Sequence, residues 1–271
     1  MNIGVLLVLN DDRVEEKIAR VREFGFDYCQ FTCWNHSLLT DELAERIVRA
    51  CEKYSVKIST LWVGWSGPAV WDFIEGPAVL GIVPVEYRYA RMQELMHGSD
   101  FAKKLGVGQI ATHMGFLPES PVDPQYLPML AAIRHLADHC KANGQYLLFE
   151  TGQETPVTVL RFIEDSGRDN LGVNLDPANL IMYGKANPID ALTVFGKYVR
   201  DVHAKDGKYP TCGRELGPEV PIGEGEVNFP ALVKRLKEIG YDGVLTIERE
   251  IEGDEQTRDI IAAKKLLERL V

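Results

Sequence analysis

The chain has 271 residues, 45% of them hydrophobic, which is enough to build the core of one large α/β domain or of two small ones. Its net charge of −10 and its pI near 5.2 argue against a nucleic-acid-binding surface, because phosphate contacts require clustered lysine and arginine. Five scattered cysteines, an odd number, argue against both a disulfide scaffold and a zinc ribbon in a chain of this size.

The first ten residues, MNIGVLLVLN, are apolar but do not have the features of a targeting segment. They lack a basic leading region and a small-residue cleavage site, and Asp11 and Asp12 end the run too early for it to span a bilayer. We therefore interpret this stretch as the first strand of a cytoplasmic protein that has no membrane partner.

Strand-like and helix-like patterns then alternate along the chain with few exceptions. Short apolar runs predict eight strands, at Ile3–Leu9, Tyr28–Thr32, Val56–Val63, Gln109–His113, Tyr146–Phe149, Leu171–Leu175, Val199–His203 and Val244–Ile247. Helices are expected at Arg13–Phe24, from the Thr40–Asp41 cap to Tyr54, in a segment that ends at Leu105, and at Tyr126–Ala142, Val157–Asp165, Pro188–Tyr198, Phe229–Ile239 and Thr257–Leu270. Long loops follow the third and the seventh strand.

Eight strand–helix units in a row, without a break in composition, predict a (β/α)8 TIM barrel that forms a single domain over residues 1–271. A doubly wound open sheet would have fewer strands and a glycine-rich phosphate-binding turn after the first one. No such turn follows Leu9, so the barrel is the better interpretation.

Five successive predicted strands end in a residue that can bind a metal ion or exchange a proton: His113, Glu150, Asp176, His203 and Glu248. In a barrel these ends share the C-terminal rim, where neighbouring strands lie ~4.8 Å apart and where active sites are found. Each residue alone has an ordinary explanation, since a strand-terminal aspartate commonly caps the next helix and a strand-terminal histidine commonly packs in the core. Their coincidence favours a metal centre, and an oxygen-rich set with one nitrogen donor suits Mn²⁺, Mg²⁺ or Co²⁺ better than a structural zinc.

The motifs around these residues resemble one known family over essentially the whole chain. The most specific are FETGQE at Glu150, NLDPANL at Asp176, HAKD at 203–206, PIGEGEVNF at 221–229 and IERE at Glu248. They resemble the xylose-isomerase-like TIM-barrel superfamily, specifically its sugar isomerase/epimerase branch of tagatose 3-epimerase-like enzymes. The resemblance implies one divalent metal ion, usually Mn²⁺, Co²⁺ or Mg²⁺ with Zn²⁺ as a further candidate, held by Glu150, Asp176, His203 and Glu248.

The resemblance also implies that Glu150 and Glu248 act as the acid/base pair. One glutamate would remove the proton next to the carbonyl of a metal-bound ketose, giving a metal-stabilised ene-diolate, and the other would return a proton from the opposite face. The expected partner is a small-molecule carbohydrate, without a phosphate because no glycine-rich cradle accompanies the loop cations. Residues expected to bind the substrate are His113, Trp34, Trp65, Asn179, Lys205 and Arg214, with Trp62 and Trp71 either stacking on the sugar or packing in the core.

One position departs from the family pattern and leaves the reaction open. Asn179 stands where the ketose 3-epimerases have a substrate-binding histidine. A dehydratase or lyase acting on a keto-sugar, similar to inosose dehydratases or 3-keto-glycoside lyases, is therefore an alternative function, and a non-catalytic sugar-binding subunit is a second. DNA repair, as in the endonuclease IV relatives, is disfavoured because further histidines are missing and the chain is acidic. The resemblance implies a homodimer or homotetramer.

Overall fold

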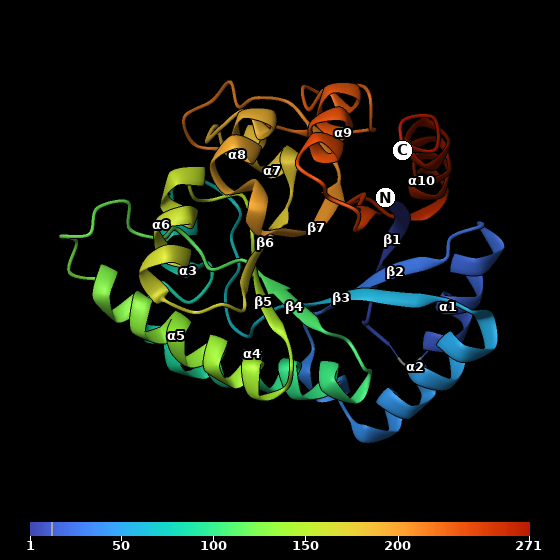
Figure 1. The fold of residues 1–271 in the computed structure, drawn as a ribbon, viewed down its shortest axis with the longest axis horizontal. Coiled ribbons are helices and arrows are strands. Elements are labelled where there is room, and N and C mark those ends of the chain that lie inside the picture. The colour runs from blue at the N-terminus through green and yellow to red at the C-terminus, as the bar shows by residue number, and fades with distance from the viewer. Residues whose placement is uncertain (12) are drawn as a thin grey trace.

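A computed structural model describes residues 1–11 and 13–271 of the chain; Asp12, one of the two acidic residues expected to end the first strand, lies outside the described residues. Eight parallel strands form a closed barrel in the order β1-β10-β7-β6-β5-β4-β3-β2, which confirms the predicted TIM barrel (Figure 1). The barrel strands are β1 Asn2–Val8, β2 Tyr28–Cys33, β3 Lys57–Val63, β4 Gln109–Thr112, β5 Tyr146–Glu150, β6 Leu171–Leu175, β7 Val199–Ala204 and β10 Val244–Ile247.

Helices surround the barrel and begin and end where local signals place them. They are α1 Val14–Glu23, α2 Asp41–Tyr54, α3 Gly76–Val79, α4 Val85–Lys104, α5 Tyr126–Ala142, α6 Pro156–Ser166, α7 Pro177–Met182, α8 Pro188–Phe195, α9 Phe229–Glu238 and α10 Gly253–Leu267, with 3₁₀ turns η1 His36–Leu38 and η2 Gly196–Tyr198. Thr40 caps α2 by accepting a hydrogen bond from the Leu43 N–H, and Thr155 caps α6 in the same way. The helix α6 ends at Gly167, whose left-handed backbone conformation suits a residue without Cβ.

The main hydrophobic core lies between the barrel and its helices, whereas the barrel interior is partly polar. Gln30 of β2, Thr60 of β3 and Asp201 of β7 are all buried there, and both Gln30 and Thr60 donate hydrogen bonds to Asp201. A second, smaller apolar cluster contains Trp62 and Trp65. Because Gln30, Thr60 and Asp201 hydrogen-bond to one another, burying their polar groups costs much less free energy than burying them unpaired would.

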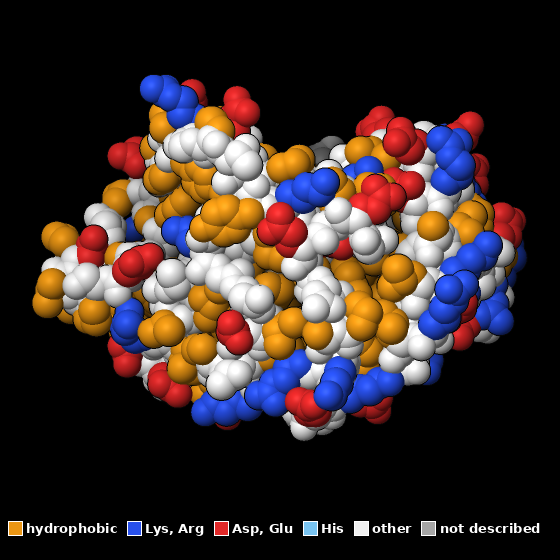
Figure 2. All heavy atoms as spheres, turned by 90° about the horizontal axis from the view of Figure 1, so that it is seen from above, with side chains coloured by type: hydrophobic (Ala, Val, Ile, Leu, Met, Phe, Trp, Pro, Cys, Tyr) orange, Lys and Arg blue, Asp and Glu red, His pale blue; other side chains and the backbone are white. Residues whose placement is uncertain are grey.

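The surface is charged but mixed in sign. On the face shown in Figure 2, lysine and arginine side chains are interspersed with aspartate and glutamate. In the described part of the chain, no helix has both the length and the apolar character needed to cross a membrane.

The structure corrects several predicted boundaries. The last helix begins at Gly253, four residues before Thr257, because Asp254 and Glu255 in its first turn suit the positive end of the helix. The helix expected at Pro188–Tyr198 becomes 3₁₀ at Gly196. The short helix α7 was not predicted. The loop after β7 contains a small antiparallel pair, β8 Asp206–Gly207 and β9 Glu219–Val220.

Candidate metal centre and active site

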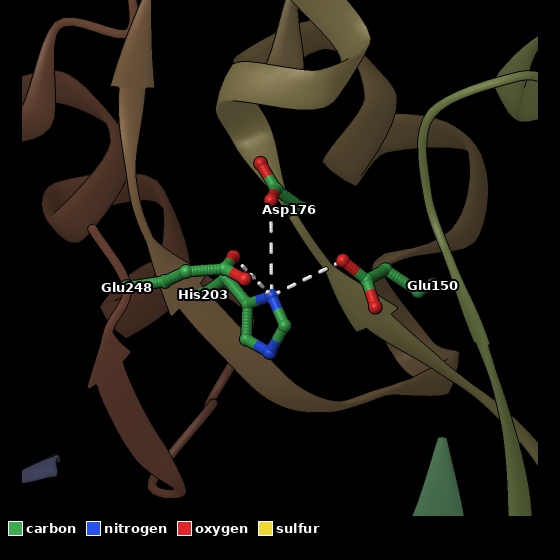
Figure 3. Close-up of side chains that lie close together, drawn as sticks. All are labelled: Glu150, Asp176, His203 and Glu248. Carbon is green, nitrogen blue, oxygen red and sulfur yellow. Dashed lines mark ion pairs between the residues drawn. The ribbon is translucent and has the colours of Figure 1, made fainter. Parts of the chain in front are cut away.

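Four of the predicted residues come together at the C-terminal rim of the barrel. Glu150 ends β5, Asp176 follows β6, His203 lies in β7 and Glu248 follows β10, and these four strands are neighbours in the barrel. One ligand atom from each residue lies within 4.8 Å of the others, and all four residues are buried (Figure 3). Asp176 also caps α7 by accepting a hydrogen bond from the Asn179 N–H, so its ordinary role and its place in the cluster coexist.

The atoms that face one another in this cluster suit a divalent cation. His203 Nδ1 lies 2.9 Å from Glu248 Oε2, 3.2 Å from Glu150 Oε1 and 3.7 Å from Asp176 Oδ2. His203 Nδ1, Asp176 Oδ2 and Glu248 Oε2 are buried and have no hydrogen-bond partner of suitable geometry among the described residues. These three atoms, together with the nearby carboxylate of Glu150, fit the donor set of Mn²⁺, Mg²⁺ or Co²⁺.

The imidazole of His203 is oriented by a residue that the sequence did not single out. Gln30 Oε1 lies 2.6 Å from His203 Nε2, and the Gln30 amide nitrogen lies 3.2 Å from Asp201 Oδ2. Because the amide nitrogen donates to Asp201, the amide oxygen is left to accept from the Nε2–H of His203. In the neutral ring, the other nitrogen, Nδ1, then carries its lone pair toward the carboxylates. A glutamine inside the buried strand YCQFTC is the signal that would have revealed it.

Burial and neighbouring positive charges have opposite effects on the pKa values of the acidic groups. Burial opposes ionisation of Glu150, but His113 and His203 outweigh it and hold the pKa of Glu150 below its ordinary value. Burial likewise opposes ionisation of Glu248, yet Lys205 and His203 lower its pKa. For Asp176 burial prevails and raises the pKa. Burial also disfavours the charged form of His203, but Glu248 and Glu150 raise its pKa well above the ordinary value.

Three side chains from other parts of the barrel contact the Glu150 carboxylate. Trp62 Nε1 donates a hydrogen bond to Glu150 Oε2, and Asn179 Nδ2 lies 3.4 Å from Oε1. His113 Nε2 is also 3.4 Å from Oε1. The predicted substrate-binding residues His113 and Asn179 therefore both contact the first glutamate, and Trp62 does so from within β3.

Lys205 lies on the opposite side of the cluster. Its Nζ atom is 3.0 Å from Glu250, 3.6 Å from Glu248 and 3.7 Å from Asp176. Glu248 and Glu250 raise the pKa of this buried ammonium well above its ordinary value, against the effect of burial. The adjacent Asp206 is not among the carboxylates that Lys205 contacts in the described part of the chain.

Asp206 instead binds the backbone of the loop that follows β7. Its carboxylate accepts hydrogen bonds from the N–H groups of Gly207, Gly223, Gly225 and Val227, at 2.9, 2.9, 3.2 and 3.1 Å. A Cβ atom at Gly225 would lie 2.0 Å from Asp206 Oδ1, so only glycine fits there. This cradle gives the motifs HAKD and GEGEV a shared structural role and anchors the loop at its base.

A cavity of about 520 Å³ opens onto the cluster. It is lined by Leu6, Val8, Thr32, Trp34, Trp62, Trp71, His113, Glu150, Asn179, Met182, Tyr183, His203, Lys205, Leu216, Ile247, Glu248, Arg249, Glu250, Ile251, Glu252, Gln256 and Ile260. Trp34 lies on the wall of this cavity and is 38% exposed. A Cβ atom at Gly64 would lie 2.5 Å from the Trp34 ring, so a glycine at this position allows the indole to lie against the backbone.

Two predicted substrate-binding residues do not line this cavity. Trp65 is only 2% exposed and packs behind Trp34, with ring centroids 5.2 Å apart. Arg214 is exposed, and its backbone carbonyl accepts a hydrogen bond from the Phe73 N–H. In this structure Trp65 supports the wall, while Arg214 links the loop after β7 to the loop after β3.

Two curated relatives match part of the chain. An uncharacterised protein of Methanocaldococcus jannaschii is 33% identical over 114 residues, which is 42% of this chain and 36% of that protein. An inosose dehydratase of Lacticaseibacillus casei is 21% identical over 147 residues, 47% of this chain and 48% of that enzyme. The chain thus spans less than half of the length of the curated relatives it matches.

Solved structures match the whole chain. A xylose isomerase domain protein from Planctomyces limnophilus is 35% identical, with a TM-score of 0.92 over 99% of this chain and 96% of that one. A D-tagatose 3-epimerase-like protein is 22% identical, with a TM-score of 0.77 over 100% and 97% of the two chains. A Mycobacterium smegmatis protein of this fold, solved in complex with magnesium, is 20% identical, with a TM-score of 0.72 over 99% and 96%.

The two structures at identities near 20% establish the fold alone, and the family follows from a family model and from the Planctomyces protein. The family model described as "Xylose isomerase-like TIM barrel" matches residues 18–270, nearly the whole chain. The Planctomyces protein matches over its whole length at higher identity. The chain therefore belongs to the xylose isomerase-like TIM barrel family.

Proposed function

We propose that this protein is a divalent-metal-dependent sugar isomerase or epimerase that moves a proton at a carbon next to a carbonyl. The observation that carries the proposal is the arrangement of Glu150 and Glu248, which approach the metal-binding nitrogen of His203 from opposite sides (Figure 3). Two carboxylates on opposite sides of one site can address both faces of a planar intermediate, as inversion of a stereocentre requires.

Glu150, Asp176, His203 and Glu248 would hold the ion, and their oxygen-rich set favours Mn²⁺, Co²⁺ or Mg²⁺. When bound, such an ion polarises a carbonyl and neutralises charge that develops on its oxygen. The magnesium complex of a protein with the same fold supports a divalent ion here and leaves its identity to measurement.

The residues around the two glutamates prepare them for proton transfer. Trp62, Asn179 and His113 fix the Glu150 carboxylate, so little reorientation is needed when it accepts a proton. Lys205 lies beside Glu248 and keeps that carboxylate ionised at neutral pH. His113 and Asn179 also line the cavity, where they can hold hydroxyl groups of the sugar.

The charges on the cavity wall favour a substrate without phosphate. Among the described residues that line the cavity, the two basic side chains are Lys205 and Arg249. Lys205 is surrounded by carboxylates, and Arg249 pairs with Glu219 at 3.1 Å and with Asp259 at 2.8 Å. No cation is left to bind a phosphate, and Glu250 and Glu252 would repel one.

A dehydratase or lyase acting on a keto-sugar is the second candidate. The inosose dehydratase relative favours it, and so does Asn179, which offers the substrate an amide that neither takes nor gives up a proton. In this reaction one glutamate removes the proton next to the carbonyl, and a second acid protonates the departing β-substituent. The substituent leaves as water or an alcohol, and a carbon–carbon double bond forms next to the carbonyl.

Proton exchange in D₂O separates these reactions. The Mn²⁺-loaded protein is incubated with ketoses, inososes and 3-keto-glycosides and followed by NMR, with Glu150→Gln as the inactive variant and the exposed Glu215→Gln as the matched control. Deuterium next to the carbonyl together with a new epimer or isomer supports the proposal, and loss of water or alcohol selects the second candidate. Sugar binding without exchange across the panel would contradict both and leave a non-catalytic sugar-binding subunit.

A further inference from the structure

The wall of the cavity is divided into a polar and an apolar side by the order of the strands. β5, β6, β7 and β10 are consecutive in the barrel and supply the four metal-binding candidates. β1, β2, β3 and β4 complete the ring on the other side. β1, β2 and β3 supply Leu6, Val8, Thr32 and Trp62, Trp34 follows β2 directly, and His113 follows β4. Trp71, from the loop after β3, adds a third indole. We refer to Leu6, Val8, Trp34, Trp62 and Trp71 as the apolar arc.

The apolar arc offers few hydrogen-bonding groups to a ligand. Thr32 is the one polar side chain that β1, β2 and β3 present to the cavity, apart from the indole N–H groups. The N–H of Trp62 already donates to Glu150. A free sugar carries hydroxyl groups around its whole rim, and hydroxyls pressed against this arc would lose their bonds to water without replacement.

The arc is open to the cavity and continues beyond the strands. Val8 is 44% exposed and Trp34 and Trp71 are each 38% exposed, whereas Trp62 of the same arc is 5% exposed. β10 lies next to β1, and the segment that follows it adds Ile251 and Ile260 to the cavity lining, together with the polar Arg249, Glu250, Glu252 and Gln256. Contiguous apolar surface inside a concave site marks a place where an apolar part of a ligand is buried.

The size of the cavity agrees with a ligand larger than one sugar ring. About 520 Å³ lies within the ~300–1,000 Å³ of pockets that enclose drug-sized ligands. We propose that the substrate is a keto-sugar bearing an apolar aromatic or alkyl substituent, which lies against the apolar arc while the sugar oxygens face the metal-binding side. The sugar half of this assignment rests on the proposed function; the apolar half rests on the arc alone.

Paired glycosides test the arc without requiring turnover. The affinities of methyl and phenyl glycosides of glucose, galactose and mannose, in both anomers, are measured by calorimetry on the Mn²⁺-loaded protein. Burying a phenyl ring on the arc should make at least one phenyl glycoside bind tenfold or more tightly than its methyl counterpart. In Val8→Ser and Trp71→Ala this preference should fall below threefold while Mn²⁺ affinity stays unchanged. Val122→Ser, a matched change at an exposed valine outside the cavity, should leave it intact.

The outcomes distinguish this inference from the proposed function. A panel in which no phenyl glycoside binds more tightly than its methyl partner, including one in which none binds, overturns the apolar substituent. So does a phenyl preference that survives both Val8→Ser and Trp71→Ala. If proton exchange occurs on a free ketose but no phenyl preference is found, the result supports the isomerase or epimerase function and rejects the proposal of an apolar substituent on the substrate. A preference that depends on Val8, without exchange on any keto-sugar, supports the arc and rejects the proposed reaction.

Discussion

Gln30 and His203, 173 residues apart in the chain, meet inside the barrel with Gln30 Oε1 2.6 Å from His203 Nε2. This contact sets which imidazole nitrogen faces the carboxylates. The amide of Gln30 is in turn held by Asp201, one layer deeper in the barrel. The candidate metal centre thus depends on a strand, β2, that contributes no metal-binding candidate of its own.

Replacing Gln30 by leucine should weaken Mn²⁺ binding about 10- to 100-fold, because His203 loses the acceptor that fixes its tautomer. Titration against a competing chelator measures the effect. Gln109→Leu is the matched control, since Gln109 Nε2 donates to Thr60 Oγ1 at 2.8 Å and is farther from the cluster. Equal Mn²⁺ affinity in Gln30→Leu and in the unaltered protein would contradict this role.

Metal binding should release close to one proton near neutral pH. In the ion-free protein Glu248 and Glu150 raise the pKa of His203, so its imidazole is protonated, whereas coordination requires the neutral ring. Apparent affinity should therefore rise about tenfold per pH unit below that pKa. Calorimetry in buffers of different ionisation enthalpy counts the protons. His203→Gln should abolish the release; an unchanged proton count in that variant would assign it to another group.

Replacing Asp206 by asparagine should loosen the loop at 206–228 because four backbone N–H groups lose a charged acceptor. The expected loss of unfolding free energy is roughly 1–3 kcal/mol. Hydrogen exchange of the Gly223 and Gly225 amides should accelerate. Glu224→Gln changes an exposed carboxylate in the same loop and should leave exchange unaltered. Protection that persists in Asp206→Asn would show that the loop is held by other contacts.

Arg91 is a fully buried cation that binds backbone carbonyls instead of a carboxylate. It donates to Val79 O and Gly81 O at 2.6 Å each, to Pro68 O at 3.0 Å and to Ser66 O at 3.2 Å, all in the loop that carries Trp71.

Arg91→Met should cost roughly 3 kcal/mol or more of unfolding free energy, since these carbonyls would lose their partner. Chemical denaturation measures the loss, and tryptophan fluorescence reports the rearranged loop. Arg49→Met is the control, because the exposed Arg49 pairs with Glu45 on its own helix. A loss no larger than that of the control would mean that the loop is braced elsewhere.

Glu154 should make stability fall as pH rises. Burial raises its pKa to about 8, against the effects of Lys185 and of the neighbouring backbone N–H groups of Gln153 and Glu154. Because the pKa of Glu154 is raised in the folded state, this residue's contribution to the free energy of unfolding is fully present below pH ~4.5. That contribution is lost as the pH rises through about 8. Glu154→Gln should therefore unfold at a higher temperature than the unaltered protein at pH 9, with a smaller gap at pH 5. A gap independent of pH would exclude a titrating Glu154.

The amino-acid sequence determined the order of strands and helices, because each depends on local periodicity, capping residues and glycine stops. It also located Glu150, Asp176, His203 and Glu248, since a polar residue at the end of a buried strand is visible without knowing its neighbours. Their role as metal ligands stays a prediction. The short helix α7 was missed because its six residues, PANLIM from Pro177 to Met182, fit a loop or a helix equally well.

The tertiary structure alone decided which side chains face one another across the barrel. The contacts of Gln30 with His203 and of Trp62 with Glu150 join strands separated by 173 and 88 residues, and no local pattern encodes such pairs. Trp34 and Trp65 look alike in sequence, yet one lines the cavity and the other packs behind it. The division of the cavity into a metal-binding side and an apolar arc has the same origin: it arises when the barrel closes and brings β1 beside β10.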